Sequence, residues 1–199
     1  DRVYTAAAGS KQRRSAQTAM HEILEVLVRL MAPILSFTAD ELWQYMKGSD
    51  RSPSVHTDLF IPVKEEYMDQ GLAARWELIL TIRREVSRVL ETARREKQIG
   101  HSLDAAVTLG CPADLLDKLS PYKGSLRSIF IVSSAELVPT EQMEGASGSE
   151  IIPGLKVHVS PSPAPKCDRC WVHDGTVGSH ADHPAICSRC HGALHESEA

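Results

Sequence analysis

Four of the five cysteines form two closely spaced pairs, and this pattern carries the clearest chemistry in the chain. Cys167 and Cys170 are followed by Cys187 and Cys190, which gives C-x2-C-x16-C-x2-C. Such pairs serve as disulfides, redox centres or metal ligands. Two residues between cysteines let one tight turn direct both thiolates at a single ion, and two such turns complete a tetrahedron. The spacing therefore favours a zinc site, with a rubredoxin-like iron centre as the alternative metal.

The disulfide interpretation depends on the cellular compartment. The first residues, D-R-V-Y, show neither the basic nor the apolar region of a secretion signal. We therefore expect a reducing, cytoplasmic location, where disulfides are rare. No run of about 18 apolar residues occurs, so we expect no membrane span and no membrane partner.

A zinc ion held by four thiolates has no open position for water or substrate. One such ion per chain would be structural, and it would order a segment with few large apolar side chains. Histidines are numerous around the cysteines, but four thiolates already complete the ligand set, so we expect the histidines at the surface or beside the ligands. They are His173, His180, His183, His191 and His195.

Basic and aromatic side chains beside the cysteines could bind nucleic acid, by phosphate neutralisation and base stacking. The candidates are Lys166, Arg169, Trp171 and Arg189. A plainer interpretation remains open, in which Trp171 packs beneath the cysteine turns as the small core of the module and the two arginines are solvated. The net charge of −4 excludes a generally basic nucleic-acid coat, so any such binding must be local.

A second basic group lies on a long predicted helix. Arg84, Arg88 and Arg95 could follow a phosphate backbone, or they could form an ordinary solvated face with an ion pair between Glu91 and Arg95. The isolated Cys111 has no base or partner nearby in the sequence, and we interpret it as structural.

The hydrophobic pattern places these candidates on a chain whose first part is helical and whose second part contains strands and a short helix. Periodic apolar residues predict a helix over 11–31. A second helix is predicted to start at a capping box at Thr38 and to stop before Gly48. A third is predicted over 72–98, with a C-cap at Gly100. Strands are predicted over 103–109, 128–138 and 155–159, and a short helix over 113–119.

These elements predict the fold class and its division. The first part is mainly α and belongs to a helical bundle; a small α+β junction and a four-cysteine zinc module follow. The predicted segments are 1–100, 101–160, a Pro-rich linker at 161–165, and 166–199.

The stretch Q-I-G-H at 98–101 differs by one letter from the phosphate-binding signature H-I-G-H of class I aminoacyl-tRNA synthetases. That signature should follow a strand and open a helix, whereas here a predicted helix ends and a strand begins. No K-M-S-K-S-like partner, P-loop, nucleophile elbow or H-E-x-x-H helix occurs. The sequence therefore predicts no catalytic residues in this chain.

Other motifs carry a family resemblance along nearly the whole chain. The run R-R-S-A-Q-T at 13–18, continuing to L-M-A-P-I-L-S-F-T-A-D-E-L-W at 30–43, resembles the anticodon-binding helical domain of the bacterial isoleucyl-tRNA synthetase family. The pattern R-x-K-x-I-G-x-S-L-x-A at 95–105 resembles the junction after that domain. C-x-R-C-W at 167–171 and C-x-R-C at 187–190 resemble its terminal zinc module.

The resemblance implies a C-terminal fragment that binds tRNA(Ile) and works with the rest of a synthetase chain. The catalytic domain, which uses ATP, and the editing domain would lie outside the fragment, as would the first helices of the anticodon domain. The fragment alone would then be non-catalytic, with no DNA partner. Two other classes stay open: the zinc-finger tail of a DNA glycosylase, and a zinc ribbon for protein–protein docking.

Overall fold

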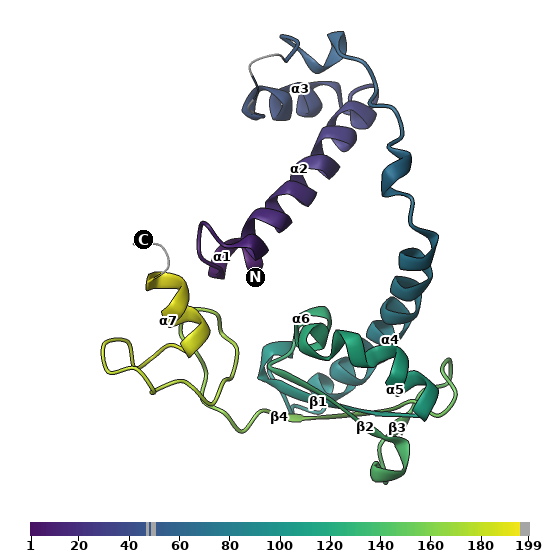
Figure 1. The fold of residues 1–199 in the computed structure, drawn as a ribbon, viewed down its shortest axis with the longest axis vertical. Helices are drawn as coiled ribbons and strands as arrows, with labels where there is room; N and C mark the ends of the chain where they lie inside the picture. Colours follow the sequence, from purple (N-terminus) through teal and green to yellow (C-terminus); the bar gives the residue numbers. More distant parts are fainter. Residues whose placement is uncertain (47, 49–50, 196–199) are drawn as a thin grey trace. The chain divides into compact units, whose positions relative to one another are not determined.

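The computed structural model describes residues 1–46, 48 and 51–195, and Figure 1 shows the order of its elements. Contacts divide the chain into two units. The first is Asp1–Met68, together with the residues from Gly192 onwards, and the second is Asp69–His191. The sequence predicts a boundary near residue 100, whereas this division falls between Met68 and Asp69. The reason is that the long helix after Met68 shares its core with the sheet that follows it.

The first unit is helical, as predicted. It contains α1 (Arg2–Thr5), α2 (Lys11–Met31) and α3 (Ser36–Tyr45), followed by short 3-10 helices at Val55–Thr57 and Glu65–Tyr67. The bounds of α2 match the predicted range. The capping box predicted at Thr38 is wrong, because α3 begins at Ser36 after Leu35 and Thr38 lies inside the helix.

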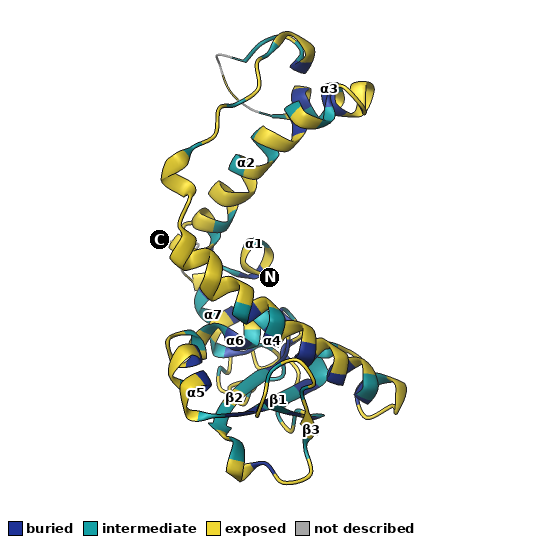
Figure 2. Cartoon of the chain, turned by 90° about the vertical axis from the view of Figure 1, so that its right-hand side faces the viewer, coloured by how far each residue is buried: buried dark blue, intermediate teal, exposed yellow. Residues whose placement is uncertain are grey.

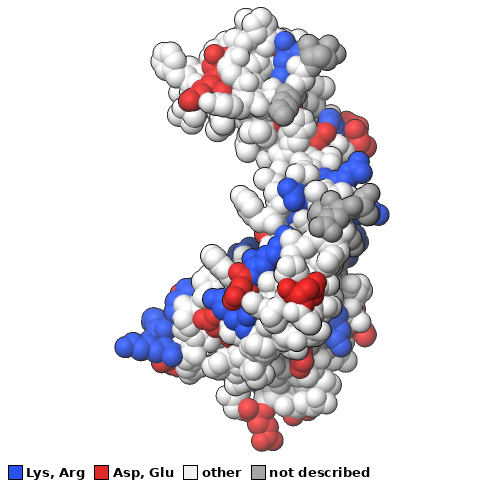
Figure 3. Space-filling view, turned by 90° about the vertical axis from the view of Figure 1, so that its left-hand side faces the viewer, with Lys and Arg blue, Asp and Glu red and all other residues white. Residues whose placement is uncertain are grey.

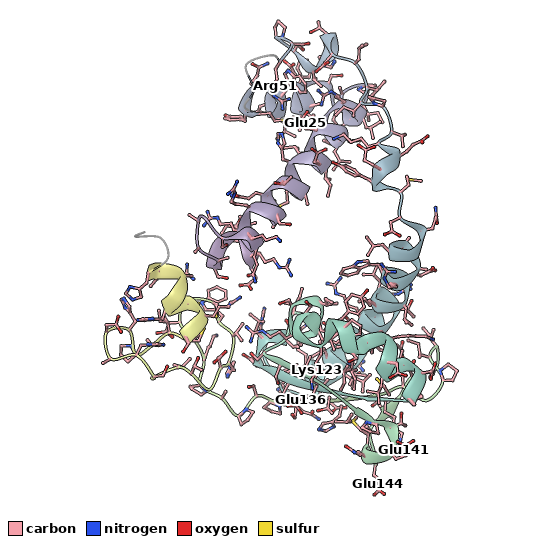
Figure 4. All side chains as sticks on the ribbon, viewed as in Figure 1. Glu25, Arg51, Lys123, Glu136, Glu141 and Glu144 are labelled. Atoms are coloured by element: carbon pink, nitrogen blue, oxygen red, sulfur yellow. The ribbon has the colours of Figure 1, made fainter. Side chains whose placement is uncertain are left out.

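A small core and a charged network join α2, α3 and the segment after them. Buried Val28, Trp43 and Val55 belong to this core. Glu25 accepts hydrogen bonds from Arg29 and Arg51, and both guanidinium groups lie over the Trp43 ring, 4.6 and 4.7 Å from a ring centroid. Figure 4 shows Glu25 and Arg51 on these neighbouring segments.

Most of the apolar face of α2 is exposed in this unit (Figure 2). Val28 is its one fully buried residue among those described. Met20, Ile23 and Leu30 are each more than half exposed. This agrees with the expectation that α2 belongs to a larger helical bundle, because an amphipathic helix needs a partner for its apolar side.

The second unit begins with α4 (Gln70–Arg95), capped by the Asp69 carboxylate, which accepts from the Leu72 amide. Its apolar face is buried only from Ile79 onwards, whereas Leu72 and Trp76 are exposed. Gly100 is not the C-cap that the sequence predicts. The helix ends at Arg95, and Lys97 takes the left-handed conformation with φ 59°.

A four-stranded sheet follows α4, with strand order β2-β1-β4-β3. The strands are β1 (Ala105–Cys111), β2 (Ser134–Pro139), β3 (Ser147–Gly148) and β4 (Lys156–Pro161). β1 pairs in parallel with β2 and antiparallel with β4, so that Val107 lies opposite both Ala135 and Val159. The alternate residues of β1 that begin at Ala105 are buried, which indicates one face packed against helices.

The parallel crossover from β1 to β2 runs through α5 (Ala113–Leu119), a 3-10 helix (Ser120–Ser125) and α6 (Leu126–Phe130). The bounds of α5 match the prediction, whereas the predicted strand over 128–138 is wrong in its first half. Leu126 and Phe130 are buried at helical i, i+4 spacing, and Ile131 ends α6 in the left-handed conformation. The strand starts at Ser134.

The predicted class of a mainly α part, a small α+β part and a four-cysteine module is confirmed. Among the described residues, no helix is long and apolar enough to cross a membrane. The remaining elements are short 3-10 helices at Ser102–Asp104 and Thr140–Gln142, and α7 (Ser188–His195), which follows Cys187.

Candidate metal centre and nucleic-acid interface

The first cysteine pair lies in a tight turn closed by backbone hydrogen bonds. Lys166 and His173 form an antiparallel bridge, and the Cys167 amide donates to the Val172 carbonyl at 2.9 Å. The Trp171 amide donates to the Cys167 carbonyl at 2.8 Å. This geometry points the Cys167 and Cys170 side chains inward, where both are buried.

The second pair is placed by the start of α7. Cys187 directly precedes the helix, its carbonyl accepts from the His191 amide at 2.9 Å, and Cys190 lies in the first turn. The Cys187 amide also donates to the Cys167 sulfur at 3.3 Å. The two cysteine turns therefore meet at their sulfur atoms.

The sulfur geometry fits a tetrahedral metal ion. All four cysteines are buried and unpaired by disulfides, and their sulfur atoms lie within 4.8 Å of one another. The Cys170 and Cys187 sulfurs are 3.8 Å apart. A tetrahedral zinc with Zn–S bonds of about 2.3 Å requires sulfur–sulfur separations of about 3.8 Å. The structure thus brings together all four predicted ligands at a spacing suited to zinc.

The thiols differ in acidity within this cluster. Burial raises the pKa of Cys190 to about 12 and also raises that of Cys187. Burial acts in the same direction on Cys167, but the amides of Cys170, Cys187 and Arg169 outweigh it and lower its pKa to about 6. A metal ion must therefore displace protons from part of the cluster when it binds.

Two of the predicted RNA-binding residues contact the cysteines instead of only facing solvent. Arg169 Nη1 lies 3.5 Å from the Cys190 sulfur. Burial would lower the pKa of Arg189, but its hydrogen bond to Cys170 raises it. Four thiolates and one Zn²⁺ carry a formal charge of −2, which these two guanidinium groups are placed to balance.

Trp171 lies on the surface and does not pack beneath the cysteine turns. Its side chain is 61% exposed, and Lys166 Nζ lies 5.8 Å from the ring centroid. Leu103, Val177 and Ile186 pack around the cysteines in the place predicted for Trp171. Trp171 also has φ 65°, a left-handed conformation that is unusual for a bulky residue.

The arginines predicted on α4 are exposed and make local contacts. Arg84 donates to the Thr81 hydroxyl at 2.9 Å, and Arg88 lies 3.5 Å from Glu85 and 3.4 Å from the Gly148 carbonyl. Arg95 is exposed at the end of the helix. The ion pair predicted between Glu91 and Arg95 is wrong, since Glu91 pairs with Arg94 at 2.5 Å, one residue earlier. These contacts favour the solvated face for α4.

Basic and acidic side chains are interspersed on the face shown in Figure 3, in keeping with the negative net charge. This face therefore offers no broad basic surface to the predicted RNA-binding residues. Lys166 and Trp171 instead form a local arrangement in which a cation lies beside an aromatic ring.

The histidines lie outside the four-sulfur set. His180 stacks on His191 with ring centroids 3.8 Å apart, and His191 Nε2 lies 2.9 Å from Asp182. His183 meets His191 edge to face, and His195 is exposed at the end of α7. His173 faces the α+β part, where its Nε2 lies 3.4 Å from Asp104. These positions agree with the expected surface and neighbouring roles.

The Q-I-G-H stretch has a structural role in this fold. The Asp104 carboxylate accepts hydrogen bonds from the Gly100 and His101 amides, at 3.2 and 2.7 Å, so those amides are not available to a phosphate. Cys111 is buried in the sheet core, and burial raises its pKa to about 11, which leaves it a neutral thiol. Neither feature provides a catalytic group.

Sequence reasoning missed Ser133, a residue at the centre of the junction between the α+β part and the zinc module. It is 3% exposed, and its hydroxyl contacts both the α+β part and His173 of the cysteine module. A single serine next to an apolar run gives no signal of such a contact in the sequence.

Comparisons with known proteins identify the class of molecule that has this fold and site. Residues 1–109 match the family of the anticodon-binding domain of tRNA ligase, and residues 165–191 match a zinc finger found in FPG and IleRS. The chain therefore belongs to the tRNA-ligase anticodon-binding family and carries a zinc finger.

Within that family, the chain is similar to isoleucine–tRNA ligases. It is 46% identical to that of Geobacter sulfurreducens over 194 residues and 48% identical to that of Syntrophotalea carbinolica over 195 residues. It is also 46% identical to that of Moorella thermoacetica over 193 residues. These alignments cover 96 to 98% of this chain but 20 to 21% of each relative, so the chain spans about a fifth of their length. The resemblance predicted from the sequence is confirmed.

Proposed function

We propose that this chain is the tRNA-binding C-terminal portion of an isoleucine–tRNA ligase. It would position tRNA(Ile) through its anticodon arm for ATP-dependent aminoacylation by a catalytic domain outside the chain. The observation that carries the proposal is the succession, in one chain, of an anticodon-binding match over residues 1–109 and a zinc-finger match over 165–191. A cytoplasmic location and the rest of the synthetase as a partner belong to the same proposal, as do the segments 1–100, 101–160, 161–165 and 166–199.

The zinc ion serves this function as a structural centre. Cys167, Cys170, Cys187 and Cys190 would hold it, and with four sulfur ligands it leaves no position open for a substrate. What it provides is a fixed path for the chain between Lys166 and His173, which presents the Trp171 side chain to solvent. The fragment alone would catalyse no reaction.

The best-supported RNA contact is the pair formed by Lys166 and Trp171. RNA-binding proteins recognise unstacked bases by stacking them on aromatic rings, and anticodon loops present such bases. An indole that is 61% exposed, with an ammonium group beside it, can stack on a base while the ammonium group meets a phosphate. Arg169 and Arg189 would support this surface from the metal site, and a role for Arg84, Arg88 and Arg95 would be secondary.

The alternative of a DNA-glycosylase tail has less support. The zinc-finger match is shared between FPG and IleRS and so does not separate the two classes. The match over residues 1–109 and the similarity to isoleucine–tRNA ligases along nearly the whole chain separate them, and both favour a tRNA partner. The alternative of a docking ribbon describes only a part of the chain, because the module packs against its own α+β part.

Binding of the zinc-loaded 199-residue chain to RNA stem-loops tests the proposal. We expect it to bind the isoleucine anticodon stem-loop more tightly than a stem-loop with the same stem and a different anticodon. Affinity should fall with salt, with a slope near −0.7 for each phosphate contact on single-stranded RNA. No ATP–pyrophosphate exchange is expected. Equal affinity for both hairpins, or a preference for duplex DNA with an abasic site, would contradict the proposal.

A further inference from the structure

The zinc module is attached to the α+β part by more than the Pro-rich segment that the sequence predicts as a linker. The segment begins inside β4, which ends at Pro161, and the Ser162 amide then donates to the Asp104 carbonyl at 2.7 Å. Leu103, just before β1, packs against the buried cysteines. Arg127 on α6 reaches Asp174 of the module at 3.8 Å. The two parts thus share a packed junction.

Ser133 lies at the centre of this junction. Its hydroxyl donates to the Leu103 carbonyl and accepts a hydrogen bond of 2.7 Å from the His173 amide. Its own amide donates to the Ala105 carbonyl at 3.0 Å. One buried residue therefore connects the start of β1 with His173, two positions after Trp171. An apolar side chain at this position would leave the Leu103 carbonyl and the His173 amide without this partner.

The side chain of His173 strengthens the same junction. Its Nδ1 lies 2.7 Å from the Ala164 carbonyl, and its Nε2 lies 3.4 Å from the Asp104 carboxylate. That carboxylate also accepts from the Gly100 and His101 amides. Because His173 forms a β-bridge with Lys166, the turn between these two residues, which carries Trp171, is fixed at its base on the α+β part.

The backbone that delivers Ser133 is strained. Ile131, two residues earlier, has φ 59°, a conformation that is costly for a β-branched residue. The turn is nevertheless held by a hydrogen bond of 3.0 Å from the Val132 amide to the Arg127 carbonyl. Ile131 is 48% exposed, so its side-chain packing does not explain the strain. The strained turn has one clear structural result, which is the placement of Ser133.

We propose that Ser133 is a positioning residue that fixes the direction of the zinc module, and with it the Lys166–Trp171 surface, relative to the α+β part. The orientation follows from the contacts alone, whereas its value for RNA binding rests on the proposed function. Without the hydroxyl, the module keeps its metal and its chain connection but samples other orientations. The RNA-competent orientation is then only partly populated, and the apparent affinity falls by that fraction.

The test compares Ser133→Ala with Ser128→Ala, a matched change at an exposed serine of α6, in the zinc-loaded 199-residue chain. Residual dipolar couplings report the orientation of residues 166–191 relative to the sheet. We expect one alignment tensor to fit both parts in the wild type and in Ser128→Ala, but not in Ser133→Ala. One zinc per chain should remain in all three, and Ser133→Thr should restore the single tensor.

The RNA readout separates this inference from the proposed function. We expect Ser133→Ala to weaken binding of the isoleucine anticodon stem-loop about fivefold, because of the two hydrogen bonds that the hydroxyl makes, the one from the His173 amide joins the zinc module to the α+β part, and its loss is worth about that factor. If the orientation changes and the affinity does not, the junction is real but the proposed RNA surface is wrong. If Ser133→Ala keeps a single tensor, the inference is overturned whatever the RNA result.

A measurement on the wild type guards against a variant that fails to fold. The His173 amide should exchange with solvent as slowly as the amides of β1, because a buried hydroxyl accepts its hydrogen bond. Rapid exchange at His173 beside slow exchange in β1 would overturn the inference without any substitution.

Discussion

Replacement of Trp171 by alanine separates an RNA-stacking role from a packing role. The side chain is 61% exposed, so its removal should change the free energy of unfolding by no more than about 0.5 kcal/mol and leave one zinc per chain. A tryptophan that formed the core of the module would instead cost about 3–5 kcal/mol. The loss of one stacked base should weaken binding of the anticodon stem-loop by about 1–3 kcal/mol, or roughly 5- to 150-fold.

The backbone at this position supplies a second, independent comparison. Trp171 has φ 65°, which glycine adopts without strain and alanine does not. Trp171→Gly should therefore be at least as stable as Trp171→Ala, although glycine is usually the more destabilising residue. Both variants should lose RNA affinity equally, and Trp171→Phe should keep most of it because the ring remains.

Anisotropy of a labelled anticodon stem-loop gives the affinities, and chemical denaturation with zinc analysis gives the stability. The labelled RNA is needed because Trp43 and Trp76 also fluoresce. Trp76→Ala is the matched control for stability: that side chain is 39% exposed on α4 and distant in sequence from the cysteines, and its loss should leave one zinc per chain. The reasoning is refuted if Trp171→Ala binds RNA as the wild type does, or if it loses zinc.

Three further changes test the supporting structure. Gly154→Ala should cost about 2–4 kcal/mol of unfolding free energy in denaturation, because Gly154 has φ 76° and a Cβ there would lie 2.6 Å from Pro112 Cγ; Gly124→Ala, in open space, should cost less than 1 kcal/mol. Arg169→Gln removes a guanidinium beside the Cys190 sulfur and should release zinc to a chelator about tenfold faster; an unchanged release rate would argue against charge balance. Lowering the pH should weaken zinc binding in a chelator titration, because protons re-occupy the two thiols whose pKa values are raised without the ion; pH-independent affinity would contradict this.

The elements that the sequence predicts well are those with a local cause. The helix over 11–31 and the short helix over 113–119 have the expected bounds, since helical spacing of apolar residues and flanking prolines define them. The cysteine set has a local cause as well, because the C-x2-C spacing itself brings two sulfurs together. Motif spacing could therefore indicate the metal centre before any packing was known.

The parts that could not be predicted depend on tertiary contacts. The run I-F-I-V at 129–132 suits a strand by propensity, but Phe130 is needed in the core four residues after Leu126, so the segment is helical and ends at a left-handed Ile131. The exposure of Trp171 likewise depends on Leu103, about seventy positions earlier, which fills the space beneath the cysteine turns. Ser133 and His173 are forty residues apart, and no periodicity could indicate their contact.

The charge of the metal centre bears directly on where RNA can bind. Four thiolates and a divalent ion leave a formal charge of −2, which would repel a phosphate backbone unless it is balanced nearby. Arg169 and Arg189 are directed at the sulfur atoms, so their charge offsets the cluster and adds little to attraction beyond it. If the module binds an anticodon loop as proposed, the attraction comes from the Lys166 ammonium group and the Trp171 ring. Binding at this module should accordingly show a shallow salt dependence, of about one phosphate contact, together with a strong dependence on the aromatic ring.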